Sequence, residues 1–128
     1  MSTAYYALFH ALCRNAADTL IGRARAARAS PAWRQTYRAV EHGLAKGQCE
    51  KRAVIGKFPK EIQAFAEAFI VLQERRQSAD YDPAARFEDS EVEELITRAE
   101  VVIAGLARAP LADRRAFAAF VVFGRNRR

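Results

Sequence analysis

The chain has 128 residues, the size of a single domain, and 51% of them are hydrophobic. Only six glycines and four prolines interrupt it, and its recurrent alanine favours helices over the β-branched and aromatic mixture that is typical of sheets. We therefore predict an all-α fold, with one domain over residues 1–128 that forms an up-and-down antiparallel bundle of four to five helices.

The charge balance is basic, with 21 Lys and Arg against 15 Asp and Glu and a net charge of +6. Such a surface permits the binding of polyanions but does not establish it. No signal sequence opens the chain, and its longest apolar run, residues 116–123, is too short to span a bilayer. Cys13 and Cys49 have neither C-x-x-C nor metal-site spacing. We expect a cytoplasmic protein with reduced thiols and without membrane contact, metal or cofactor.

The first predicted helix runs from about Ser2 to Gly22, a favourable residue just beyond a helix end. One apolar stripe holds Tyr6, Phe9, His10, Cys13, Ala17 and Leu20, and a second beside it holds Tyr5, Leu8 and Leu12. The clearly opposite positions are Arg14, Asn15 and Asp18. An arc this broad predicts packing on two sides, against the helix's own bundle and against a partner subunit.

The second predicted helix opens at Ser30-Pro31 and runs to about Lys46, before Gly47. Its apolar face holds Trp33, Tyr37, Val40 and Leu44. His42 falls on the opposite, polar face, so we expect it to meet water or a ligand rather than the core.

Pro59 opens a third helix, and a fourth begins with the capping box at residues 90–93. The third has Ile62, Phe65, Ala66, Phe69, Leu72 and Gln73 on one face, and the fourth has Val92, Leu95, Ile96, Ala99, Val102, Ile103 and Leu106. Arg76 continues the stripe of the third helix, whereas Arg75 lies about 100° away from it. A short fifth helix, from Leu111 to Phe123, follows Pro110.

Common enzyme motifs are absent, since there is no phosphate-binding G-x-x-x-x-G-K-[ST] loop, dinucleotide fingerprint, H-E-x-x-H or nucleophile elbow. The two histidines are the candidates for acid-base chemistry near neutral pH. On its apolar stripe, His10 is expected to be buried and hydrogen-bonded. His42 is expected at the surface, and a catalytic role is the alternative for both.

Arg76 must be solvated or paired, because burying a lone guanidinium is very costly. One interpretation is a structural staple, in which Arg76 bonds Asp80 and Tyr81 plugs the end of the bundle. In the other, Arg76 lies at the mouth of a cleft and binds a phosphate, whose oxygens suit its forked geometry. The two interpretations are compatible.

Two stretches together resemble the HEPN (higher eukaryotes and prokaryotes nucleotide-binding) superfamily. They are an A-Y-Y-A-x-F-H helix and a later R-x-x-A-D-Y, carried here by Ala4, Tyr5, Tyr6, Ala7, Phe9, His10, Arg76, Ala79, Asp80 and Tyr81. The resemblance implies a small helical bundle, commonly a homodimer, whose relatives include metal-independent ribonucleases and toxin partners of minimal nucleotidyltransferases. Relatives place another helix before the first motif, whereas only residues 1–3 precede it here. This implies a missing N-terminal helix or a partner that covers the surface.

In the catalytic relatives an arginine is followed four to six residues later by a histidine. Arg76 matches the arginine, but residues 80–83 read Asp, Tyr, Asp and Pro, without a histidine. We therefore expect a nucleotide- or RNA-binding protein that holds phosphate with Arg76 and Arg75, supported by Asp80, Tyr81, Tyr6 and His10. The expected partner of this protein, in a toxin-antitoxin-type system, is a minimal nucleotidyltransferase. The alternatives are a metal-independent ribonuclease that uses His10 or His42, and a structural dimeric module that neutralises or scaffolds that partner.

Overall fold

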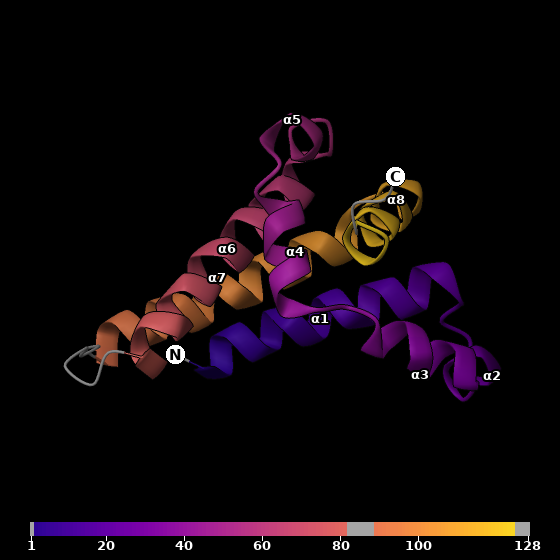
Figure 1. Ribbon diagram of the computed structural model, residues 1–128, viewed down its shortest axis with the longest axis horizontal. Helices are drawn as coiled ribbons and strands as arrows, with labels where there is room; N and C mark the ends of the chain where they lie inside the picture. Colours follow the sequence, from indigo (N-terminus) through magenta and orange to yellow (C-terminus); the bar gives the residue numbers. More distant parts are fainter. Residues whose placement is uncertain (1, 82–88, 125–128) are drawn as a thin grey trace.

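The protein is an all-α helical bundle (Figure 1). The computed structural model describes residues 2–81 and 89–124, apart from the side chains of residues 2 and 78–81. The helices in this part are α1 (Ser2–Leu20), α2 (Arg25–Arg28), α3 (Pro31–Arg38), α4 (His42–Cys49), α5 (Arg52–Ile55), α6 (Lys60–Tyr81), α7 (Asp89–Arg108) and α8 (Leu111–Val122). Within the described ranges, no helix is both long and apolar enough to cross a membrane.

Helix α1 is the centre of the packing, because α3, α6, α7 and α8 all lie against it (Figure 1). Its own chain therefore covers most of its apolar arc. Two stripe assignments were wrong, since Tyr6 and His10 are exposed. Asn15 was also misplaced: it is buried, and its side-chain amide donates a hydrogen bond to the carbonyl of Arg114 at 3.1 Å, which satisfies a polar group that would otherwise be costly to bury.

Helix α1 ends at a glycine, as predicted. Gly22 has a φ of 148°, a conformation that disfavours any side chain, and its N–H donates to the carbonyl of Ala17 at 3.2 Å. The chain then turns back through α2 and enters α3, where the hydroxyl of Ser30 accepts a hydrogen bond from the N–H of Trp33 at 3.2 Å. This confirms the predicted cap and directs α3 back along α1.

The predicted second helix is wrong in two respects, the first being that the chain leaves the helical conformation between Arg38 and His42. Glu41 is extended, with φ of −110° and ψ of 137°. Helix α3 packs on α1, whereas α4 packs on α6 and α8, so one straight helix could not serve both. Helix α4 also continues through Gly47 to Cys49. The break turns His42 toward α1.

Helices α6 and α7 pack against each other, and α6 carries its apolar face as predicted. The six predicted core residues of α6 are all buried. On α7, Leu95, Ala99, Val102 and Leu106 are buried, while Val92, Ile96 and Ile103 are partly exposed. The regular helical spacing of these residues was therefore a reliable guide to which side of each long helix faces the core.

Helix α4 is tied to α8 by a buried side chain that the sequence did not single out. The amide of Gln48 donates to the carbonyl of Phe120 at 2.8 Å, and Gln48 is 4% exposed. Gly124 lies directly against it, since a Cβ at that position would lie 2.2 Å from the amide carbon of Gln48. Gly124, which follows the last helix, thus has no side chain where the Gln48 side chain packs against its backbone.

Candidate functional site

The guanidinium of Arg76 lies over two tyrosine rings of α1. Its central carbon is 5.1 Å from the centre of the Tyr5 ring and 5.5 Å from that of the Tyr6 ring. These distances are within cation–π range, and such contacts contribute about 0.5–2 kcal/mol each depending on their desolvation. Arg76 is half-buried, Tyr5 is fully buried, and Tyr6 is 41% exposed. The arginine is therefore held at the boundary between the core and solvent.

His42 belongs to the same cluster. The hydroxyl of Tyr5 hydrogen-bonds Nδ1 of His42, and burial raises the pKa of Tyr5 well above its usual value despite the opposing charge of Arg76. The tyrosine is thus protonated and donates, which leaves the imidazole proton on Nε2. Burial and, secondarily, the charge of Arg76 lower the pKa of His42. His42 is therefore a neutral imidazole beside a positive guanidinium.

The ring of Phe9 lies under His42. Their ring centres are 3.8 Å apart with an interplanar angle of 14°, a close parallel stack. The expectation that His42 faces away from the core was therefore wrong, because the break before α4 turns it onto α1. Phe9 and Tyr5 together fix both the position and the orientation of the imidazole.

His10 forms a second polar contact farther along α1. Its Nδ1 lies 2.6 Å from the hydroxyl of Tyr37 on α3, and the two rings are stacked with centres 6.2 Å apart. The predicted burial of His10 was wrong, since an exposed position of α1 carries it, but the predicted hydrogen bond is present. Both rings border a groove of about 580 Å³ that also contacts Trp33 and Arg14.

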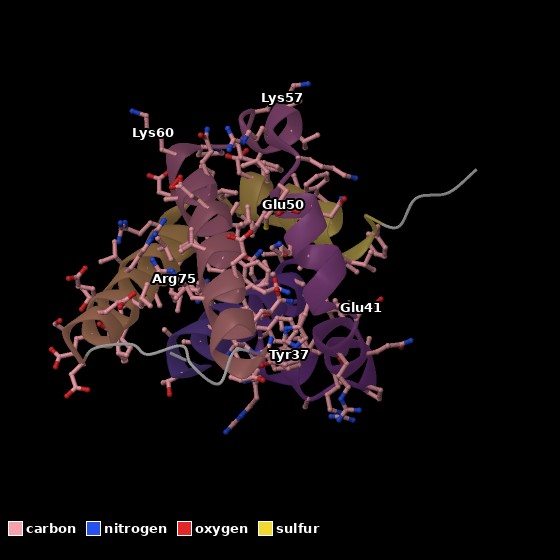
Figure 2. All side chains as sticks on the ribbon, turned by 60° about the vertical axis from the view of Figure 1, so that its left-hand side comes forward. Tyr37, Glu41, Glu50, Lys57, Lys60 and Arg75 are labelled. Atoms are coloured by element: carbon pink, nitrogen blue, oxygen red, sulfur yellow. The ribbon has the colours of Figure 1, made fainter. Side chains whose placement is uncertain are left out.

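Arg75 has different surroundings from those of Arg76. It hydrogen-bonds the carboxylate of Glu91, and Figure 2 shows it on the side of α6 that faces α7, away from Tyr37. The helical phase therefore separated the two arginines correctly. The predicted contacts of Asp80 and Tyr81 lie outside the described side chains.

The cluster of Tyr5, Tyr6, Phe9, His42 and Arg76, called here the Arg76 cluster, combines three chemical capacities. An arginine offers several N–H donors that match phosphate oxygens, and the exposed ring of Tyr6 offers a surface on which a nucleobase can stack. The neutral imidazole could exchange a proton near neutral pH. Within the described residues no group of three or more His, Cys, Asp or Glu could hold a metal ion.

The prediction grouped Tyr6 and His10 with Arg76; the structure places Tyr6 beside Arg76 and His10 beside Tyr37. Sequence reasoning missed the pairing of His42 with Tyr5 and Phe9. The signal available was weak: His42 is separated from Tyr37 by neither glycine nor proline, so nothing local marks the break in the helix. Comparison with known proteins adds no assignment, since no protein-family model, curated protein or solved structure matches the chain.

Proposed function

We propose that the protein binds RNA or a nucleotide through the Arg76 cluster. The observation that carries this proposal is the position of the Arg76 guanidinium over Tyr5 and the exposed ring of Tyr6. One surface then offers a cation for a phosphate and an aromatic face for a base, the combination that single-stranded nucleic acids require. The net charge of +6 favours the approach of such a ligand.

The resemblance to the HEPN superfamily supports the same proposal, because Arg76 matches the arginine of that family's catalytic motif. The homodimer and the nucleotidyltransferase partner, within a toxin-antitoxin-type system, are proposals that rest on the resemblance alone. The Arg76 cluster is assembled within one chain, so binding through it needs no second subunit.

Binding of a fluorescent single-stranded oligoribonucleotide at low salt tests the proposal. We expect Arg76→Gln to bind about 10-fold more weakly or worse, because a charged hydrogen bond contributes about 1.5–3 kcal/mol. Arg75→Gln is the matched control: it removes the same charge one residue away, from a side chain already paired with Glu91, and should have a smaller effect. The wild-type affinity should fall as salt rises, through counterion release. Equal affinities of the two variants would contradict the role of Arg76.

The position of His42 favours a second candidate function, metal-independent cleavage of RNA. This role needs the other tautomer, with the proton on Nδ1, where it donates to the Tyr5 hydroxyl. The neutral imidazole near Arg76 could then accept a proton from a ribose hydroxyl at Nε2 while the arginine stabilises the phosphate. The RNA recovered from the binding experiment distinguishes the two functions on a denaturing gel. Intact RNA supports binding alone. RNA that wild type cuts in the presence of EDTA, and that His42→Asn leaves intact, supports cleavage.

A further inference from the structure

A second basic site lies on α1, beyond the Arg76 cluster. It is a pocket of about 330 Å³ between α1, the α2 region and the junction of α7 with α8. Its lining includes Arg14, Arg23, Arg28 and Arg114, with Asp18 as the acidic residue among those that border it. The lining therefore carries three net positive charges, four from arginine and minus one from aspartate. The volume falls within the roughly 300–1,000 Å³ of small-ligand sites.

The single carboxylate of this pocket is already occupied. Arg28 binds both oxygens of Asp18, at 3.0 and 2.8 Å, and Nε1 of Trp33 donates to it at 3.0 Å. Arg14 approaches it only to 3.8 Å. Arg28 thus neutralises the charge of Asp18. Arg14, Arg23 and Arg114 keep their positive charges at the pocket.

Arg114 is oriented by a neutral group. Its Nε donates to the carbonyl of Ala109 at 2.9 Å, a bond that fixes the side chain without cancelling its charge. Neither Arg114 nor Arg23 has a carboxylate partner within the described part of the chain. Placing like charges together around one hollow is unfavourable unless an anion or solvent screens them.

Apart from Asn15 and Thr19, the remaining walls are apolar. Ile103, Leu106 and Ala107 of α7 and the half-exposed Leu111 of α8 line the pocket beside the arginines. An anion that also carries an apolar body would bury it there while its charged end meets the guanidinium groups. A phosphate ester, which has a charged end and an organic body, matches the arginines and the apolar wall better than a free inorganic anion does.

We propose that this pocket binds the phosphate group of a nucleotide, with Arg14, Arg23 and Arg114 as its phosphate ligands and the α7–α8 wall beneath the nucleoside. The same phosphate chemistry can come from a mononucleotide or from one residue of an RNA strand. The site shares no lining residue with the Arg76 cluster, so it stands whether or not that cluster binds RNA.

Isothermal titration with adenosine monophosphate, adenosine and a six-residue oligoadenylate tests this site. We expect the monophosphate to bind and adenosine to bind about 10-fold more weakly or worse, since only the former offers charge-assisted hydrogen bonds. The double variant Arg14→Gln, Arg23→Gln should lose at least about 10-fold in affinity for the monophosphate. Both side chains are exposed, so the variant should fold, which circular dichroism checks.

The control is the double variant Lys57→Gln, Lys60→Gln, which removes the same net charge from residues outside the pocket lining, between α5 and the start of α6 (Figure 2). This lysine variant should retain binding of the monophosphate. Trp33, the single tryptophan, contacts the Asp18 carboxylate at the pocket. Its fluorescence should therefore change as the monophosphate is added, and should saturate at the same concentrations as the isothermal titration.

A third outcome is that the oligoadenylate binds and the monophosphate does not. If the Arg14, Arg23 variant then binds the oligoadenylate more weakly than the lysine variant does, the result supports the same site with RNA as the source of the phosphate. Binding that the arginine and lysine variants weaken equally would overturn the proposal, as would no binding of either phosphate ligand. Loss of monophosphate binding in Arg76→Gln alone would overturn it too, while supporting the Arg76 cluster.

Discussion

At the scale of single residues, His42 is the most informative side chain of the cluster. Its imidazole accepts from Tyr5, stacks on Phe9 and lies beside the charge of Arg76. Burial and the charge of Arg76 favour the neutral form, since a second proton would have to be desolvated and would place a cation beside a cation. The folded protein therefore resists protonation of His42 more than the unfolded chain does.

This resistance predicts a specific pH dependence of stability. The pKa of His42 is lowered from its usual value of about 6.5. Below about pH 6.5 the unfolded chain therefore binds more protons, and the free energy of unfolding should fall by up to about 1.4 kcal/mol per pH unit until the folded pKa is reached. Above about pH 6.5 both states are neutral at this residue and its contribution is constant. Urea unfolding at several pH values measures the slope.

The variant His42→Asn removes the titration but keeps an oxygen near the position of Nδ1 to accept from Tyr5. Its stability should depend less on pH than that of wild type below about pH 6.5. His10→Asn is the control, because it leaves the Tyr5–His42 bond in place and should keep the slope that His42 contributes. A wild-type slope equal to that of His42→Asn would show that His42 is not the titrating group.

At the scale of elements, the sequence predicted the long helices well and the short ones poorly. The stripes of α6 and α7 repeat over several turns, so burial of one face is the only arrangement that hides their apolar residues. Between Arg38 and His42 no such repetition exists, and contact with distant helices decides where the chain bends. Only the family resemblance placed Tyr6 with Arg76. Helical periodicity could not do so, because the contact of Arg76 with Tyr5 and Tyr6 depends on how α6 crosses α1.

Two glycines contrast tertiary packing with local helix propensity, and they give a pair of opposite predictions. Gly124→Ala should lower the free energy of unfolding by about 1–2 kcal/mol, because its Cβ would displace Gln48 from the Phe120 carbonyl and leave buried polar groups unpaired. Gly47 lies within α4, and no neighbouring group comes within 4 Å of the place that a Cβ would occupy there. Gly47→Ala should therefore raise that free energy by about 0.5–1 kcal/mol, since alanine favours the helix.

Thermal or urea unfolding of both glycine variants checks this pair. Equal shifts of the same sign would mean that the approach of Gly124 to Gln48 does not constrain α8. A stabilised Gly47→Ala alone would support the helical propensity argument and contradict the packing argument.

At the scale of the whole molecule, α1 connects the parts of the bundle. Because α3, α6, α7 and α8 all contact it, removing α1 from its place would expose the apolar faces of all four. Helix α4 has fewer neighbours, α6 and α8 among them. The two proposed sites lie along the same helix, so they are expected to be lost together when α1 unfolds.

The reaction rates of the two cysteines should report the order in which parts of the bundle open. Cys13 lies in α1 and Cys49 at the end of α4; both are unpaired and buried, and burial raises the pKa of each thiol to about 12. A disulfide reagent reacts with the thiolate, so it should modify either residue only during an opening of the structure. In the single-thiol variants Cys13→Ala and Cys49→Ala, we expect Cys49 to be modified first, through detachment of α4, and Cys13 only at the rate of global unfolding. Faster modification of Cys13 would mean that the centre of the bundle opens before its edge.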